Sequence, residues 1–330
     1  MRRSGREALS SASPLGALDP VTRTASIPGV ELRQLRHFEE IVNAASFGQA
    51  ADRLHLTQPA LSKSIRNLEA HLGVQLFERH PGGVSLTEYG RVFLDYATLI
   101  NSEIGRAVDH LSELKGTGTG VVRVGAGATV MKYLMPEAVR RFMDGDGRHS
   151  LVFVQDLRAN LAAKLRRGEI DVMIGSQKAG DEDFHAEPVL EDVISVVAAR
   201  GHPLENAPVG LADLARFRWI LPDSTETEND RLAAAFARAG IKGPDVAVRV
   251  SSSLFMSQWL KDGPFLSYLP RALVTRVEEY RHLITLDTVE SIWAPVPIAV
   301  LYRRRGVMLR STRRFVNRLK EVGAELQREI

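Results

Sequence analysis

The segment that decides the fold of this chain runs from Ser46 to Leu72 and reads SFGQAADRLHLTQPALSKSIRNLEAHL. Its pattern predicts two short helices joined by a tight break. Ser46 precedes the first helix and Gln49 follows three residues later, which is the spacing of a reciprocal capping box. Thr57 is a favourable N-cap for the second helix, and Pro59 falls in the first turn, where its missing N–H is tolerated.

The second of these helices has two chemically different faces. Its apolar residues recur at the spacing of one helical face, which predicts packing on a core: Leu61, Ile65, Leu68 and Leu72. The opposite side carries polar and cationic residues: Gln58, Pro59, Ser62, Lys63 and Arg66. Such a helix can present side chains to base edges and phosphates in DNA. A solvated helix on any globular core has the same pattern, so the neighbouring segments must decide.

Those neighbouring segments complete a recognisable unit. A helical apolar stripe precedes the pair: Leu32, Leu35, Phe38, Ile41, Val42 and Ala45. After the pair, short strand-like runs at 76–79 and 84–86 flank the turn sequence His80-Pro81-Gly82-Gly83. Three helices followed by a hairpin form a winged helix-turn-helix, a mainly α-helical DNA-binding domain expected at 30–87.

The sequence motifs of this segment and their order resemble those of the N-terminal domain of LysR-type transcriptional regulators. The matching phrases are LRQL at 32–35, AADRLH at 50–55, TQPALS at 57–62, IRNLE at 65–69, LGVQLFER at 72–79 and LTEYG at 86–90. The resemblance implies a regulator that binds double-stranded promoter DNA, with these expected contacts: Gln58, Pro59, Ser62, Lys63, Arg66, Arg53 and Thr57. It also implies a homo-oligomer, either a dimer or a tetramer, and RNA polymerase is a further candidate partner.

Composition excludes several other classes of protein. The 330 residues leave room for more than one core, and 44% hydrophobic with 25% charged residues is ordinary for a soluble protein. No stretch approaches the ~18 uninterrupted apolar residues of a membrane-spanning helix. The absence of cysteine excludes disulfides, thiolate catalysis and cysteine-bound zinc. These features favour a cytoplasmic protein without a membrane partner.

Charge is distributed unevenly along the chain. The formal net charge of +3 mildly favours a polyanionic partner. Residues 31–90 carry six Lys/Arg against seven Asp/Glu, a net of −1, so DNA affinity must depend on where the cations point. Residues 300–330 carry nine against three, a net of +6, which we interpret as a solvated helix face. Residues 1–29 lack periodicity and an apolar core, so we predict a disordered tail rather than a secretory signal.

One long helix is predicted at 88–115. Its apolar positions repeat every 3.5 residues, the period of a coiled-coil seam: Phe93, Ala97, Ile100, Ile104, Ala107, Leu111 and Leu114. A helix outside a compact domain can bury such a seam only against a partner chain, whereas a core helix would lie on its own domain. The resemblance favours dimerisation through this helix.

The pattern of apolar residues changes after a predicted glycine-rich hinge at 116–120. Short apolar runs then alternate with helical stretches, which predicts α/β units with largely parallel strands: 121–124, 151–154, 172–174, 194–198, 219–221, 246–250, 265–269 and 299–302. The resemblance implies an α/β effector-binding domain at 121–330, built like a periplasmic solute-binding protein. Its lobe I is expected at 121–197 and 295–330, and its lobe II at 198–294.

Hydroxyl residues mark several places where a strand runs into a helix: Thr129, Ser224, Thr225, Ser252 and Ser253. Helix N-termini favour anions, and hydroxyl groups donate hydrogen bonds to a carboxylate or sulfonate. Arg158, at another such junction, could clamp an anion bidentately, and the family holds its effector with a hydroxyl residue near Thr129. The same residues also serve as ordinary N-caps. We therefore expect a small organic anion as effector, with a neutral sugar as the alternative.

Catalytic motifs are absent from the sequence. Gly125 and Gly127 follow a strand as in a dinucleotide fingerprint, but Val130 stands where the third glycine belongs. There is no Gly-x-Ser-x-Gly elbow, Walker A loop or His-Glu-x-x-His pair. We therefore expect no enzymatic activity, cofactor or metal. The remaining alternative is a solute-binding receptor that does not bind DNA and whose N-terminal part merely dimerises.

Overall fold

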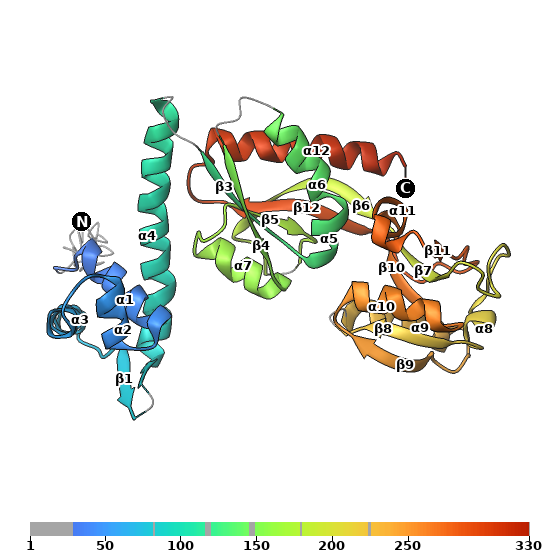
Figure 1. Cartoon of the computed structure of the whole chain (residues 1–330), viewed down its shortest axis with the longest axis horizontal. Coiled ribbons are helices and arrows are strands. Elements are labelled where there is room, and N and C mark those ends of the chain that lie inside the picture. The colour runs from blue at the N-terminus through green and yellow to red at the C-terminus, as the bar shows by residue number, and fades with distance from the viewer. Residues whose placement is uncertain are drawn as a thin grey trace, which may run out of the picture. The chain divides into compact units, whose positions relative to one another are not determined.

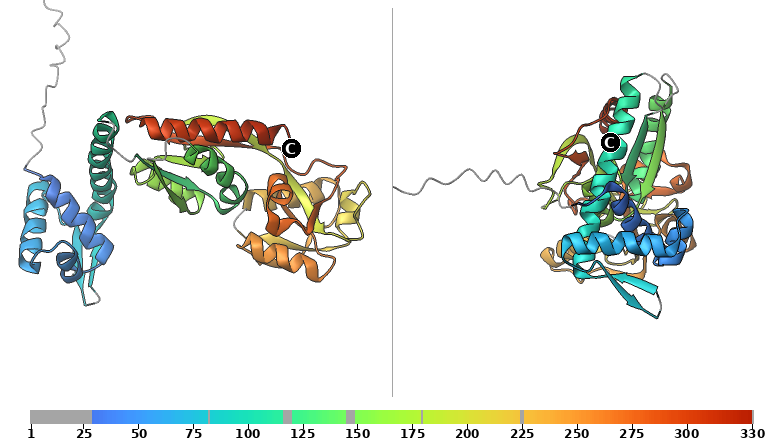
Figure 2. Two further views of the ribbon diagram at one scale, coloured as in Figure 1. Left: turned by 45° about the horizontal axis from the view of Figure 1, so that its top comes forward. Right: turned by 90° about the vertical axis from the view of Figure 1, so that its left-hand side faces the viewer.

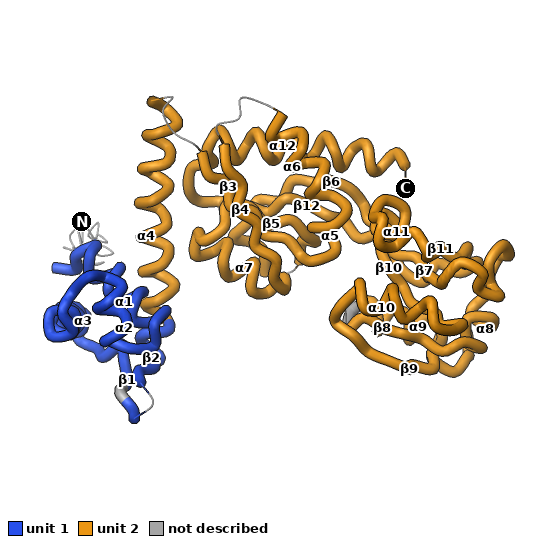
Figure 3. Tube along the Cα trace, in the orientation of Figure 1, with its two compact units in different colours: residues 1–91 blue, residues 92–330 orange. Residues whose placement is uncertain are grey.

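The computed structural model describes residues 29–81, 83–115, 120–144, 149–178, 180–223 and 226–329. The chain forms two compact units, 1–91 and 92–330, which Figure 3 shows in blue and orange. The boundary falls near the start of a long helix, α4 (Glu88–Leu114). The predicted tail and the predicted hinge lie, apart from Gly29 and Gly120, outside the described residues.

The first unit is a winged helix-turn-helix, as predicted (Figure 1). Three helices precede a two-stranded hairpin: α1 (Leu32–Ala44), α2 (Phe47–Arg53), α3 (Gln58–Leu72), β1 (Phe77–His80) and β2 (Gly83–Leu86). The two strands pair antiparallel, and Pro81 lies in the turn between them. This hairpin is the wing.

Aromatic packing and one carboxylate fix the wing to the helices. The ring of Phe77, at the start of β1, lies 5.1 Å from that of Phe38 on α1 and 5.7 Å from that of Phe47 on α2. The carboxylate of Glu69 on α3 accepts the N–H groups of Leu76 at 2.8 Å and Phe77 at 3.3 Å. The wing therefore shares a core with the helices.

The hydrogen bonds at the N-termini of α2 and α3 are those that the sequence predicts, with one exception. Thr57 accepts the N–H of Ala60 at 3.4 Å, as an N-cap should. Ser46 likewise accepts the N–H of Gln49 at 3.4 Å. The return bond of the predicted capping box does not form within the described chain. Gln49 is exposed, so water competes for its side-chain amide.

Lobe I of the second unit is built on a five-stranded sheet with the order β4-β3-β5-β12-β6 (Figures 1 and 2). Its strands are β3 (Val121–Ala126), β4 (Ser150–Gln155), β5 (Val172–Gly175), β6 (Phe184–Asp192) and β12 (Val296–Arg303). One face is covered by α6 (Met135–Met143) and α12 (Arg310–Gln327), and the other by α7 (Arg158–Arg166). A short helix, α5 (Ala128–Tyr133), follows β3.

Lobe II contains two smaller sheets. An antiparallel sheet has the order β10-β7-β11, and a parallel pair joins β8 and β9. The strands are β7 (Ile194–Ala199), β8 (Arg218–Pro222), β9 (Asp245–Val250), β10 (Ser267–Pro270) and β11 (Leu283–Thr285). The helices are α8 (Leu211–Leu214), α9 (Glu226–Arg238), α10 (Ser253–Trp259), η1 (Leu260–Asp262), α11 (Arg271–Arg276) and η2 (Glu278–Tyr280).

Two expectations about the sheets need correction. Strands β3, β4 and β5 are parallel, but β12 runs antiparallel to both β5 and β6. The reason is topological, because the chain leaves lobe I along β6 and returns along β12. The predicted crossing near Ala198 is also wrong, because β7 already belongs to the second lobe from Ile194 and the crossing is at Val193.

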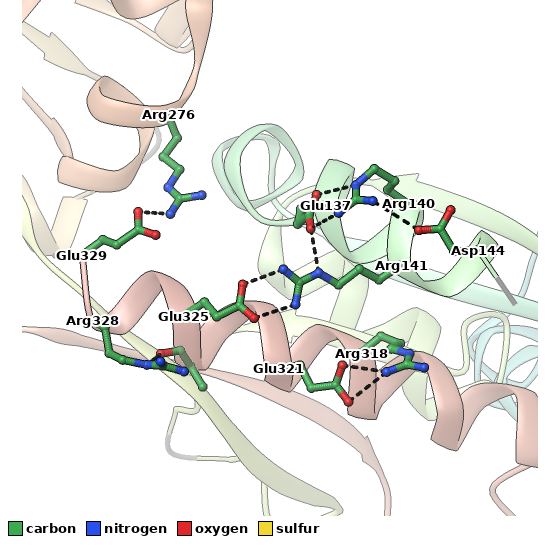
Figure 4. Close-up of polar contacts among 11 residues, drawn as sticks. Glu137, Arg140, Arg141, Asp144, Arg276, Arg318, Glu321, Glu325, Arg328 and Glu329 are labelled. Carbon is green, nitrogen blue, oxygen red and sulfur yellow. Dashed lines mark hydrogen bonds and ion pairs between the residues drawn. The ribbon is translucent and has the colours of Figure 1, made fainter.

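An ion-pair network joins α6 to the basic helix α12 (Figure 4). Arg141 on α6 binds Glu325 on α12, with Nη1 2.8 Å from Oε1, and also reaches Glu137 at 2.6 Å. Hydrogen bonds from Arg140 and then Arg141 hold the pKa of Glu137 at about 2. These groups face solvent, so each pair contributes little stability. This part of the basic C-terminal segment is therefore a solvated helix surface, as the sequence suggested.

Candidate DNA interface and effector site

Helix α3 presents most of the predicted DNA-contacting side chains. Gln58, Pro59, Lys63 and Arg66 are exposed. Ser62 is only 9% exposed, so its predicted place on the open face is wrong. Because α3 packs against both α1 and α2, its buried stripe is wider than the single face that Leu61 to Leu72 define. The exposed set therefore keeps two cations and an amide, but not the serine.

The two remaining predicted contacts already have partners within the chain. Thr57 uses its hydroxyl to cap α3. Arg53, at the end of α2, pairs with Glu40 on α1, with Nη1 3.1 Å from Oε1. Both side chains remain partly exposed, and an exposed ion pair of this kind contributes only about 0–1 kcal/mol. A DNA phosphate could therefore exchange with Glu40 for Arg53.

A polar contact between α1 and α3 was not apparent from the sequence. The His37 Nδ1 atom lies 2.8 Å from the hydroxyl of Ser64 on α3. Burial, and then the charges of Arg33 and Arg36, lower the pKa of His37. The neutral ring therefore prevails at pH 7 and positions α3. The spacing of these residues along two different helices gave no signal for this pairing.

The apolar seam of α4 is largely open in the single chain. Ile100, Ile104, Ala107, Leu111 and Leu114 are exposed, and Phe93 is half-buried. Ala97 is already fully buried, so the predicted seam is not open along its whole length. An isolated helix with this many exposed aliphatic side chains has unburied apolar surface that a second helix could cover.

The polar side of α4 is fastened to lobe I. Arg106 and Asp171 form a largely buried ion pair, with Nε 3.1 Å from Oδ1. Ser102 donates to the carbonyl of Gly168 at 2.5 Å, and Glu103 pairs with Arg303 of β12. The carboxylate of Glu113 accepts the first N–H groups of α12, those of Arg310 at 3.2 Å and Ser311 at 3.3 Å. The helix thus has one face attached to its own lobe and another left open.

The predicted effector residues do not form one group. Arg158 is engaged elsewhere, because its guanidinium donates to the Ser176 carbonyl at 2.9 Å and pairs with the buried Asp181. The expectation of a free clamp at Arg158 is therefore wrong. Ser224 and Thr225 lie outside the described residues. Ser252 serves as the N-cap of α10 and accepts the N–H of Phe255 at 3.2 Å.

Thr129 and Ser253 lie near a cation that the sequence analysis missed. Lys132 of α5 donates to the hydroxyl of Tyr280 at 2.7 Å and lies 3.4 Å from that of Ser253. The Ser253 and Tyr280 hydroxyls are 2.9 Å apart, and the ammonium lies 5.1 Å from the Tyr280 ring centroid. Thr129 is half-buried one turn earlier on α5. A lysine three residues after the expected Thr129 was the available signal.

The described parts of the chain contain no group of three or more His, Asp or Glu side chains placed to hold a metal ion. Nor does any helix within those ranges combine the length and apolarity needed to cross a membrane. The chemistry at hand is thus that of exposed cations on α3 and hydroxyl and ammonium donors between the lobes.

A winged helix-turn-helix followed by a two-lobed α/β domain defines a DNA-binding regulator with a ligand-binding domain. Residues 32–91 match the family model described as "Bacterial regulatory helix-turn-helix protein, lysR family". Residues 115–324 match the model "LysR substrate binding domain". The chain therefore belongs to the LysR family of transcriptional regulators, which confirms the resemblance in the sequence.

Relatives along most of the chain are named as transcriptional regulators. The regulator PcaQ of Agrobacterium fabrum is 33% identical over 235 residues, which cover 70% of this chain and 76% of that protein. The regulator CbbR of Rhizobium meliloti is 33% identical over 263 residues, covering 79% and 84%. The RuBisCO operon transcriptional regulator of Allochromatium vinosum is 28% identical over 259 residues, covering 78% and 85%. These names describe regulators rather than enzymes.

Solved structures share the fold. The LysR family regulator CbnR has a TM-score of 0.65 at 22% identity, covering 89% of this chain and 99% of that one. Full-length CbnR complexed with its target DNA has a TM-score of 0.66 at 23% identity, covering 89% and 100%. At these identities the likeness shows the fold alone. The DNA-binding family nevertheless disfavours a receptor that does not bind DNA.

Proposed function

We propose that this protein binds promoter DNA sequence-specifically through α3 and responds to a small organic anion held where lobe I meets lobe II. The effector assignment rests on the surroundings of the Lys132 ammonium group, which contain no carboxylate partner in the part of the chain that the structure describes. Within the described residues, no carboxylate lies within ion-pair distance of it, and it donates hydrogen bonds to neutral hydroxyls. A cation in this position lacks the counter-charge that an anionic ligand would bring.

The residues around Lys132 come from both lobes. Lys132 and Thr129 belong to α5 in lobe I, whereas Ser253 and Tyr280 belong to α10 and η2 in lobe II. Removing a charge from water is costly unless an opposite charge or strong hydrogen bonds compensate. An anion that accepts from Lys132 and from Thr129 would therefore bind favourably and would contact both lobes.

Hydrogen-bond donors distinguish an anion from a neutral sugar here. The ammonium group has three donors and no acceptor, and each hydroxyl can donate. Thr129 is half-buried, and its hydroxyl can donate to a ligand. A sugar would present its own donors and would need acceptors in return. The hydroxyls can supply such acceptors, but the Lys132 ammonium cannot. A carboxylate or sulfonate presents only acceptors and a negative charge, so it matches Lys132 better.

Binding at this position can regulate DNA recognition only through a difference in affinity between two arrangements of the protein. A ligand that prefers one arrangement of the lobes shifts the population by that preference, typically ~1–3 kcal/mol. If α4 helices pair in a dimer, a change in lobe I would alter the spacing of two α3 helices on DNA. The effector would thereby change the affinity for the operator or its bend.

The effector proposal is tested by thermal stabilisation of the full chain with a panel of carboxylates, sulfonates and sugars. A ligand that binds only the native state raises stability by RT ln(1 + [L]/Kd). Lys132→Met should remove most of the stabilisation by an active anion. Thr129→Val should raise the Kd for that anion about tenfold, the value of one charge-assisted hydrogen bond. The control is Lys242→Met, which removes an exposed lysine in lobe II.

Lys132→Met and Thr129→Val should both retain DNA binding in the absence of effector, because neither residue belongs to the first unit. Stabilisation by sugars alone would refute the anion assignment. So would an anion whose effect is the same in the parent, Lys132→Met and Lys242→Met.

A further inference from the structure

We infer that lobe I carries a second ligand site, separate from the Lys132 junction, that takes a small dianion of the phosphate class. The site is a cavity of about 220 Å³ between α4, β6, β12 and the start of α12. It lies against the contacts that fasten α4 to lobe I. A ligand there would act on α4 directly.

The cavity has an excess of positive charge. Four arginines line it, against one carboxylate, that of Asp171. Arg106 is paired with Asp171, and Arg303 with Glu103 of α4. Arg304 and Arg305 are exposed and form no ion pair with a carboxylate of the described residues. Two arginines of the lining are therefore available to bind an anion.

A buried hydroxyl at the same cavity also lacks a partner. Thr312, in the first turn of α12, lines the cavity and is only 1% exposed. Its Oγ1 atom forms no hydrogen bond within the described residues. Buried polar groups are nearly always hydrogen-bonded, and a bound ion is one explanation for an exception. The unpaired charges of Arg304 and Arg305 and the unsatisfied hydroxyl of Thr312 are two independent features of the same cavity.

The size and donors define the class of ligand. Pockets for drug-sized molecules usually measure ~300–1,000 Å³, so this cavity suits a small ion or the phosphate group of a small ester. Guanidinium groups match the oxygens of phosphate in pairs. Two unpaired arginines balance a dianion, and Thr312 can donate to a further oxygen. Inorganic phosphate and a phosphate monoester share this chemistry.

Occupancy would compete with the attachment of α4. Arg303 lines the cavity and is also the partner of Glu103 on α4. A dianion beside Arg303 would draw the guanidinium away from Glu103 and would repel that carboxylate. Phosphate binding and the Glu103–Arg303 pair are therefore coupled with opposite sign, and each weakens the other.

The test uses the full chain and inorganic phosphate as the probe, with glycerol 3-phosphate in a second arm that separates free phosphate from a phosphate ester. Sodium chloride keeps the ionic strength constant, because screening alone changes stability. Calorimetric titration gives the Kd, and thermal stabilisation checks that binding saturates. The parent should bind at least one of the two phosphates in a saturable manner.

Four variants and one control test the assignment of residues. Arg304→Gln and Arg305→Gln should each raise the Kd about tenfold, the value of one charge-assisted hydrogen bond. Thr312→Val should also weaken binding, while leaving the melting temperature without phosphate unchanged or higher, because it removes a partnerless hydroxyl. Glu103→Gln should strengthen binding. Arg249→Gln, an exposed arginine on β9, is the charge-matched control and should bind as the parent does.

Failure of this proposal is distinguishable from failure of the effector proposal. Lys132→Met should retain phosphate binding, because it belongs to the other site. The second site is refuted if neither phosphate binds more tightly than chloride. It is also refuted if Arg304→Gln, Arg305→Gln and the Arg249→Gln control all have the same Kd. Loss of binding in Lys132→Met alone would place the phosphate at the junction between the lobes instead.

Discussion

Asp192 illustrates what a single buried residue contributes to this fold. It is the last residue of β6, immediately before the crossing between the lobes, and is only 4% exposed. Its Oδ2 atom accepts the hydroxyl of Tyr133 at 2.7 Å, and Oδ1 has no partner within the described residues. Burial raises the pKa of Asp192 from 3.8 to about 6, because the charged form loses its hydration.

This shift predicts a pH dependence of stability. A carboxyl whose folded pKa is raised stabilises the native state fully below about pH 4, and that contribution is lost as pH rises through about 6. Asp192→Asn cannot ionise, so at pH 7 it should be more stable than the parent by the order of 2–3 kcal/mol. Denaturant unfolding at several pH values measures the difference, which should vanish near pH 4. A difference that is constant from pH 4 to pH 7, as for the exposed control Asp262→Asn, contradicts this account.

Residue types and spacing predicted local roles better than long-range ones. Thr57 caps α3 because capping involves a neighbour three residues away. Arg158 and Lys132 are different, because their environments depend on partners far along the chain. Arg158 is held by Asp181 from a later loop, and Lys132 meets Tyr280 from the other lobe. A periodicity cannot reveal such partners, since it reports only on residues of the same element.

At the scale of the element, α4 carries two interactions on different faces. Its polar side binds lobe I through Ser102, Glu103 and Arg106, while its apolar seam remains exposed. The sequence predicted the seam, because a 3.5-residue repeat is visible without knowledge of the fold. It did not predict the attachment, because Asp171 and Arg303 lie far along the chain.

We expect α4 to mediate dimerisation. Ile100→Asp or Ile104→Asp would place an unpaired charge in a helix–helix seam, which costs several kcal/mol. Analytical ultracentrifugation should then show loss of the dimer, with operator affinity falling in parallel. Leu254→Asp on α10 is the matched control, because Leu254 is 42% exposed, as is Ile100. If both α4 variants kept the oligomeric mass of the parent, the alternative would be favoured, in which α4 is a core helix that packs only on its own domain.

Strands were predicted where apolar residues run together, and missed where they do not. The runs at 121–124 and 172–174 became β3 and β5. Strand β6 was missed because charged residues and Pro188 interrupt it, although it pairs along β12. β11 has only three residues, too few for a pattern. The direction of β12 could not be predicted, because it depends on the double crossing between the lobes.

At the scale of the whole molecule, α4 joins a DNA-binding unit to a ligand-binding unit. The family and the winged helix-turn-helix could be predicted from the sequence, because the matching phrases fall within a continuous segment. The residues of the proposed effector site could not be predicted as well, because they converge from separate elements. The central claim is that α3 supplies the sequence-specific contacts with promoter DNA.

That claim is tested most directly by fluorescence anisotropy with the DNA upstream of the protein's own gene, over a range of salt concentrations. Gln58→Ala should lose roughly 1–3 kcal/mol of affinity for the operator but little for random DNA, because it removes a base contact. Lys63→Ala and Arg66→Ala should weaken binding, and each lost phosphate contact should reduce the salt slope by about one. Arg281→Ala, an exposed arginine of lobe II, should bind as the parent does. Unchanged operator affinity and salt slope in Gln58→Ala and Arg66→Ala would contradict the claim.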